Sequence, residues 1–95
     1  MLFNMKELSK RIRIFVDKYA VVRPDWNKDF DDIADKYTSP DASQMLYCAD
    51  MIEIGKKPSQ CWSDWGSGGY KPYTSKEGRD EHDDLVKEIQ KIINS

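Results

Sequence analysis

The stretch WGSGGYKPY, residues 65–73, places glycines among aromatic rings and one lysine. Glycine-rich loops bind phosphate groups when their backbone N–H groups converge at the start of a helix. Here Pro72 has no N–H group to donate, the next predicted helix begins well after Gly69, and the glycines are not followed by Lys-Ser or Lys-Thr. The pattern therefore disfavours a phosphate site.

Two other interpretations of these aromatic rings stay open. The rings can cover the ends of the helices as a lid, or some of them can stay exposed and bind a protein, because Tyr and Trp beside Gly and Ser are typical of protein-binding loops. Tyr70, which follows Gly68 and Gly69, is predicted to be the exposed ring, and Trp62, nearer the preceding helix, the core ring. The predicted partner-binding residues are Trp62, Trp65, Tyr70, Lys71 and Tyr73.

Side chains that could support catalysis or bind metal are few. His82 is the single histidine, and it falls in phase with Leu85 and Ile89 on a predicted helix, which favours packing over general-base catalysis. No local signature pairs Cys61 with it as a nucleophile. The aspartate-rich stretches DFDDIAD and DEHDDL lack the glycine and closing glutamate of a calcium loop. No catalytic residue, metal or cofactor is predicted.

Composition narrows the function classes further. A chain of 95 residues forms one domain, 1–95, and its net charge of −2 lacks the basic footprint of general nucleic-acid binding. Its clustered aspartates suit a protein partner with a basic surface. No apolar run matches a membrane span or a signal peptide, so we expect a cytoplasmic protein in which Cys48 and Cys61 are free thiols.

Helical periodicity predicts the elements in the first half of the chain. Asn4 and Glu7 form a capping-box pattern before a helix over about 5–20, whose outer basic face is expected to be solvated. Pro24 ends that region. A second helix over about 25–37 is predicted, with its aspartates outward, from the spacing of Trp26, Phe30, Ile33 and Tyr37.

Start and stop signals are clearer in the second half. Ser39 as N-cap, Pro40 at the first position and Gly55 after the last turn define a helix between them. Its predicted buried stripe is Ala42, Met45, Leu46, Ala49 and Ile52. Thr74 and Glu77 form a second capping box before a last helix that runs to about 94.

These elements predict an all-α fold, a compact bundle of about four helices. The long 56–73 loop is expected to fold across one end in an irregular form, with a short hairpin as the alternative. Gly78, on the inward face of the last helix, is expected to admit an aromatic ring from that loop.

The size and composition favour a non-enzymatic protein-binding or inhibitor module that occludes a partner's surface, as accessory proteins of phages or mobile elements do. The alternative is a small-ligand module in which the aromatic loop stacks a nucleotide while Lys71 or Arg79 binds its phosphate. The sequence leaves the partner and the oligomeric state open.

Overall fold

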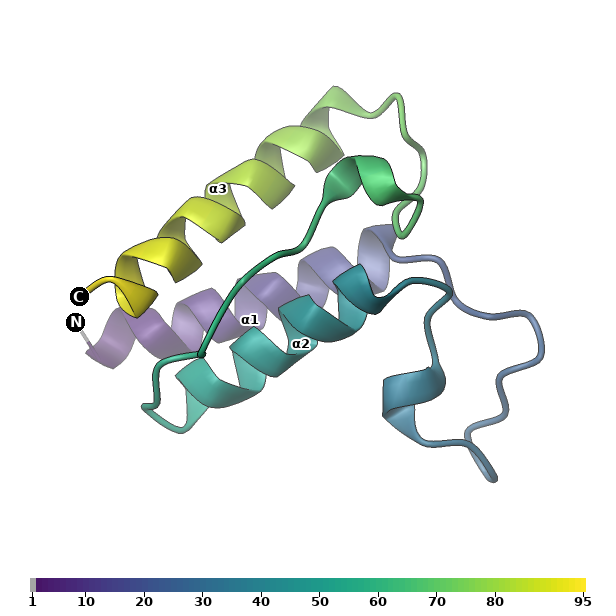
Figure 1. Ribbon diagram of the computed structural model, residues 1–95, viewed down its shortest axis with the longest axis horizontal. Helices are drawn as coiled ribbons and strands as arrows, with labels where there is room; N and C mark the ends of the chain where they lie inside the picture. The colour runs from purple at the N-terminus through teal and green to yellow at the C-terminus, as the bar shows by residue number, and fades with distance from the viewer. Residues whose placement is uncertain (1) are drawn as a thin grey trace.

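A computed structural model describes residues 2–95, with side chains from Met5 onward. In this part of the chain the fold is all-α, with neither a β-strand nor a fourth α-helix (Figure 1). The elements in chain order are α1 (Leu2–Tyr19), the 3-10 turn η1 (Ile33–Asp35), α2 (Pro40–Glu53), the 3-10 turn η2 (Trp65–Ser67) and α3 (Lys76–Ile93). The predicted class is confirmed, with three helices in place of about four.

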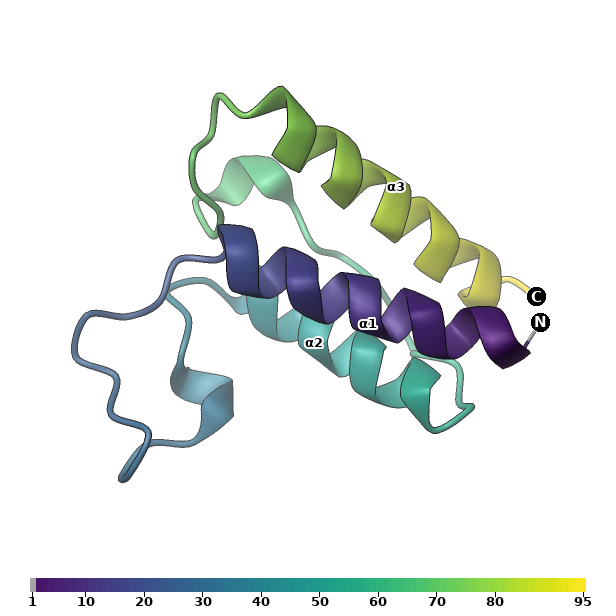
Figure 2. The same ribbon diagram turned by 180° about the vertical axis from the view of Figure 1, so that it is seen from behind.

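The helix α1 forms the spine of the bundle, because both α2 and α3 pack against it (Figures 1 and 2). It begins at Leu2, so Asn4 lies inside the helix and is not its N-cap, although the Asn4 side chain lies outside the described ones. Its end at Tyr19 is within one residue of the prediction. Its buried face carries Leu8, Ile12, Phe15, Val16 and Tyr19.

The helix α2 follows its local signals closely. The Ser39 hydroxyl accepts a hydrogen bond from the Asp41 N–H at 3.3 Å, Pro40 occupies the first turn, and Gly55 takes a left-handed conformation with φ of 77° after the end. The predicted bounds are confirmed. The predicted stripe is buried except for Leu46, which is half-buried, and Cys48 and Gln44 are buried in addition.

The predicted helix over 25–37 is wrong, because residues 20–39 form a loop that projects from the bundle and contains only η1 (Figure 1). Asn27 explains much of the difference. Its side chain accepts the N–H of Asp29 at 2.9 Å, and its own N–H donates to the Asp31 carboxylate at 2.8 Å. Such local bonds offer the backbone an alternative to a helix.

The last helix, α3, begins one residue later than predicted. Ser75, rather than Thr74, is the N-cap, and its hydroxyl accepts the Gly78 N–H at 3.0 Å. The helix ends at Ile93, within a residue of the prediction, and it buries His82, Leu85 and Ile89.

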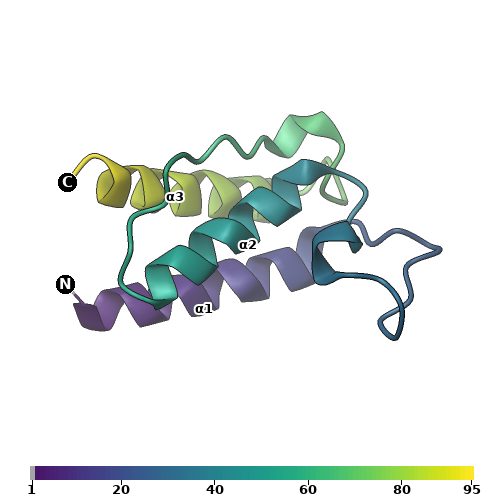
Figure 3. The same cartoon turned by 60° about the horizontal axis from the view of Figure 1, so that its bottom comes forward.

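The 56–73 segment runs back beside α2 and α3 to the far end of the bundle (Figure 3), and the irregular form is confirmed over the hairpin. At that end it bonds to the last turn of α1 and the residues that follow: Val21 N–H donates to Gly69 at 3.0 Å, and Lys71 N–H donates to Tyr19 at 2.8 Å. An isolated bridge pairs Ala20 with Tyr70. Within residues 2–95, none of the helices has both the length and the apolar character needed to cross a membrane.

Candidate functional site

Two of the predicted binding residues, Trp65 and Tyr70, belong to the core. Their rings stack on each other, with centroids 5.3 Å apart and planes 7° from parallel, and Phe15 lies 5.2 Å from Tyr70. Tyr70 is fully buried, so the prediction that it is the exposed ring is wrong. Because both of its neighbours bond to the end of α1, the residue between them is directed into the bundle.

The prediction for Trp62 is also wrong, because this ring is more exposed than expected. It was expected in the core, yet 45% of its surface is exposed. Tyr73 is exposed to a similar extent and has the Lys71 ammonium 4.4 Å from the centre of its ring. Of the predicted binding residues, Trp62, Lys71 and Tyr73 are therefore on the surface.

Gly78 lies where the sequence predicts it. A Cβ atom at this position would come within 2.5 Å of the Trp65 ring and 2.9 Å of the Tyr19 ring. The prediction that the missing side chain admits a ring from the loop is confirmed, because the indole packs directly on the α3 backbone.

A row of hydrogen-bonded polar groups runs from the aromatic core to the surface, and sequence reasoning did not find it. The Tyr70 hydroxyl is 2.7 Å from Ser63 Oγ, which is 3.1 Å from His82 Nε2, and His82 Nδ1 is 3.1 Å from Asp83 Oδ1. Burial raises the pKa of Tyr70 above its ordinary value. The only sequence signal was the phase of His82 on α3, which correctly indicated a buried histidine.

The connectivity Ser63–His82–Asp83 is that of a nucleophile, a base and an orienting acid. An acyl-transfer site also needs N–H donors aimed at an oxyanion. The N–H of the residue after Ser63 is already used, because Asp64 N–H donates to the Asp41 carboxylate at 3.3 Å. We therefore interpret the hydrogen bonds from Tyr70 through Ser63 to His82 as support for the core and not as a catalytic site.

Cys48 and Cys61 are both buried and free, as predicted, and Cys48 is the more protected. Their mutual hydrogen bond raises the pKa of Cys48 and lowers the pKa of Cys61. Cys48 also donates to the Gln60 carbonyl at 3.5 Å, so this contact fixes the start of the 56–73 segment on α2. No group of His, Cys, Asp or Glu able to hold a metal occurs among the described residues.

The most exposed large apolar residue of the described chain lies in a segment that the sequence assigned to a helix. Phe30 is 86% exposed near the tip of residues 22–36, which we call the acidic loop. Ile33 and Val22, in the same loop, are exposed by 61% and 45%. Phe30 therefore forms an apolar tip, whereas Val22 lies at the base of the loop, where it bridges to Tyr37.

The acidic loop has a defined shape in spite of its exposure. The Trp26 indole donates to the Asp32 carbonyl at 3.0 Å, and the Lys36 ammonium lies 5.1 Å from the Trp26 ring centre. At the base, Arg23 N–H donates to the Lys36 carbonyl at 2.8 Å, and Ser43 donates to Ala34 at 3.2 Å. The loop is therefore held by its own bonds and by the start of α2.

Negative charge surrounds the apolar tip. The aspartates of the acidic loop outnumber its basic residues; they are Asp25, Asp29, Asp31, Asp32 and Asp35, against Arg23, Lys28 and Lys36. The ion pair found in this loop among the described residues joins Arg23 to Asp25, at 3.5 Å. Most of the carboxylates are thus available to a partner.

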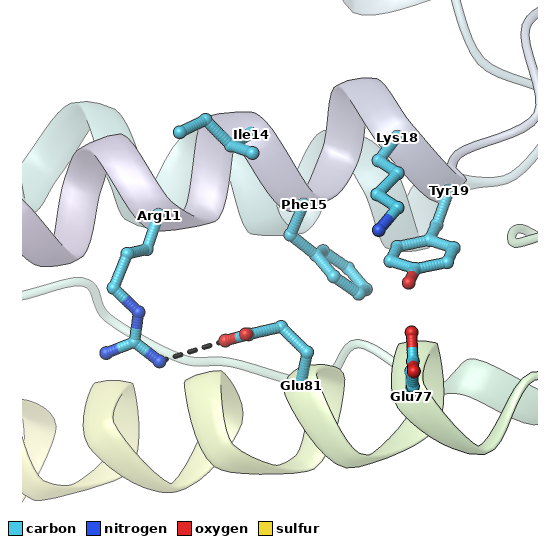
Figure 4. Close-up of a pocket in the computed structure, with 7 residues that line it drawn as sticks. All are labelled: Arg11, Ile14, Phe15, Lys18, Tyr19, Glu77 and Glu81. Carbon is cyan, nitrogen blue, oxygen red and sulfur yellow. Dashed lines mark hydrogen bonds and ion pairs between the residues drawn. The ribbon is translucent and has the colours of Figure 1, made fainter.

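A cleft of about 250 Å³ separates α1 from α3 at the end where η2 lies (Figure 4). Its lining comes from both helices and comprises Arg11, Ile14, Phe15, Lys18, Tyr19, Glu77 and Glu81. Arg11 bonds to Glu81 at 2.9 Å and to Glu88 at 2.7 Å, and these bonds raise the pKa of Arg11. At this end of the cleft the charge of Arg11 is therefore already paired.

The basic face of α1 is only partly the solvated surface that the sequence predicts. Besides Arg11, Arg13 bonds to Asp50 at 2.7 Å and to Glu53 at 3.0 Å on α2. These two arginines tie α1 to both of its neighbours. Lys6, Lys10 and Lys18 are exposed, as expected.

No protein-family model, curated protein or solved structure matches this chain.

Proposed function

We propose that this chain is a non-enzymatic protein-binding module that occludes a partner's surface with the tip of the acidic loop. The observation that carries the proposal is the 86% exposure of Phe30 in a loop whose backbone is hydrogen-bonded into one shape. Large aromatic side chains at the centre of protein interfaces are frequent anchors, and burying one phenylalanine contributes about 1.5–3 kcal/mol. Phe30 is the anchor in this proposal.

The fixed shape of the loop favours binding. Association costs free energy for every flexible side chain and loop that it orders. The acidic loop is already ordered by the bonds of Asn27 and Trp26, so that cost is reduced before the partner arrives. Ile33, which is 61% exposed in the same loop, adds apolar surface for a partner.

The aspartates of the acidic loop indicate which kind of partner surface would bind it. Carboxylates around an apolar tip match a surface that has an apolar socket with a basic rim, and this complementarity acts mainly on the association rate. Higher salt should therefore slow association by screening the carboxylates. Trp62 and Tyr73 are exposed candidates for further contacts, whereas Trp65 and Tyr70 contribute through the stability of the core.

The nucleotide-binding alternative receives less support from this arrangement. Trp65 and Tyr70 stack on each other, and the Tyr73 ring already contacts the Lys71 ammonium. Trp65 and Tyr70 are therefore not available to stack a base, which leaves Trp62 as the exposed ring of the segment without a ring or cation partner among the described residues.

The test uses the protein as bait in an extract of its native host, attached through the end of α3, which lies opposite the acidic loop (Figure 1). The parent protein should retain one stoichiometric protein, and Phe30→Ala should lose it. The matched control is Ile54→Ala, because Ile54 is also exposed but follows α2 at the other end of the bundle.

Kinetics with the purified partner test the charge argument. Asp29→Asn with Asp32→Asn should slow association and reduce its salt dependence, with little change in dissociation. Equal retention of the same protein by the parent and by Phe30→Ala would show that the loop tip is not the anchor.

A further inference from the structure

The cleft between α1 and α3 has features of a ligand site that the proposed protein contact does not use. We propose that it binds a free α-amino acid with an apolar side chain. This inference does not depend on the partner of the acidic loop, because none of the cleft residues lies in that loop.

The floor of the cleft is apolar and aromatic. Phe15 and Tyr19 are almost fully buried in the core, yet both line the cleft, and Ile14 adds an aliphatic side chain that is 56% exposed. Small-molecule sites are mostly apolar with a few polar groups that orient the ligand. An aliphatic or aromatic side chain of a ligand would cover the exposed part of Ile14 and the small part of Tyr19 that reaches water.

Two opposite charges from different helices lie at the Tyr19 end of the cleft (Figure 4). Lys18 on α1 has its ammonium 5.1 Å from the centre of the Tyr19 ring, and Glu77 on α3 points toward the hydroxyl of the same ring (Figure 4). Neither side chain makes an ion pair with any residue that the structure describes. A ligand that carries both an anion and a cation would satisfy both.

The other end of the cleft differs, because Arg11 and Glu81 already neutralise each other there. The charges left for a ligand are therefore one ammonium and one carboxylate. A zwitterion matches this pair better than a nucleotide, which carries only negative charge on its phosphates. In the proposed pose the carboxylate of the amino acid pairs with Lys18 and its ammonium pairs with Glu77.

The volume of the cleft also supports a free amino acid as the ligand. Sites for drug-sized ligands enclose roughly 300–1,000 Å³, whereas this cleft encloses about 250 Å³. A single amino acid is closer to that size than a nucleotide is. Both charged groups are exposed, and exposed ion pairs are individually weak. Binding is therefore expected at millimolar concentrations, with the apolar side chain contributing most of the affinity.

The experiment follows the backbone amides by NMR while L-phenylalanine is added to the intact protein. We expect saturable shifts that centre on Ile14, Lys18 and Glu77. Two related compounds should each bind at least about 5-fold more weakly than L-phenylalanine. Glycine has the charges without the side chain, and N-acetyl-phenylalanine amide has the side chain without the charges.

Variants test the assigned contacts. Lys18→Glu and Glu77→Gln should each weaken L-phenylalanine binding by about 5-fold or more, while Lys10→Glu, at an exposed position of α1 outside the cleft, should not. Circular dichroism and thermal unfolding establish that each variant is folded.

Three results would overturn the proposal: no saturable shifts in the folded parent, equal binding of the N-acetyl amide, or shifts that centre outside the cleft. The outcome is separable from that of the protein-binding proposal. Phe30→Ala should retain amino-acid binding, and Lys18→Glu should retain the partner of the acidic loop.

Discussion

Two loops of this chain carry aromatic residues, and only one of them places aromatic rings in the core. In the 56–73 segment, Trp65 and Tyr70 are buried, whereas in the acidic loop Phe30 is exposed. Composition does not distinguish the two cases, since both loops mix aromatic rings with turn-forming residues. The difference is whether the rest of the molecule offers the ring a place to pack.

For the 56–73 segment that place exists. Gly78 leaves a gap on α3 for the Trp65 indole, and the last turn of α1 bonds to the backbone on both sides of Tyr70. In the acidic loop, Asn27 and Trp26 bond within the loop itself. A loop that satisfies its own backbone can stand away from the core, so its apolar tip remains in water.

The largest expected effect follows from the burial of Tyr70. Tyr70→Ala should destabilise the fold by about 3–5 kcal/mol, as ring deletions in cores do, because it removes the stack with Trp65 and the bond to Ser63. Urea unfolding of both proteins measures it. A change within about 0.5 kcal/mol, typical of surface positions, would contradict the assignment of this loop to the core.

Gly78→Ala should have the next largest effect. The new methyl group would overlap Trp65 and Tyr19, and overpacking costs about 1–3 kcal/mol, which exceeds the helix-propensity gain of about 1 kcal/mol. We expect a lower melting temperature. Arg79→Ala, at the next and exposed position of α3, is the control and should change it little. A raised melting temperature for Gly78→Ala would show that the rings yield easily.

The buried phenol of Tyr70 gives the core a dependence on alkaline pH. Its pKa is raised in the folded state from an ordinary value of 10.0, so above that pH the unfolded chain loses a proton that the folded chain retains. Stability therefore falls as pH rises, by at most about 1.4 kcal/mol per pH unit from this group.

Tyr70→Phe isolates that contribution. Because phenylalanine keeps the ring and cannot ionise, the variant should lose less stability than the parent between about pH 10 and 11. Denaturant unfolding across this range measures the two slopes. Parallel slopes would mean that Tyr70 ionises with its ordinary pKa and that the core around it admits water.

The same contrast explains how much of the fold the sequence could predict. The bounds of α2 depend on Ser39, Pro40 and Gly55, which act on their own neighbourhood, so they could be predicted. The predicted helix over 25–37, which is absent from the structure, has an apolar spacing that fits a helix as well as the spacing of the helices that do form. It failed because the side chains of that region bond to the backbone, a competition that periodicity does not report.

The positions of the candidate site residues were harder to predict from the sequence than the helix bounds. The burial of Tyr70 depends on a bridge to Ala20, fifty positions earlier in the chain by number, and no local pattern indicates that pairing. The cleft likewise joins Lys18 to Glu77 across two helices. By contrast, Gly78 could be predicted, because a glycine on the inward face of a helix already implies a close neighbour.

The smallest expected effect on stability is at Phe30, and it tests the other half of the comparison. Phe30→Ala should leave the free energy of unfolding within about 0.5 kcal/mol of the parent, because the ring is already in water in the folded state. The N–H of Phe30 would still donate to the Asn27 carbonyl, so the loop should keep its shape. Urea unfolding and the amide spectrum of residues 22–36 check both points.

A loss of 2 kcal/mol or more, which is about what a buried phenylalanine contributes, would mean that Phe30 packs in solution. In that case the acidic loop would resemble the 56–73 segment, and the anchor would have to be sought at Trp62 or Tyr73.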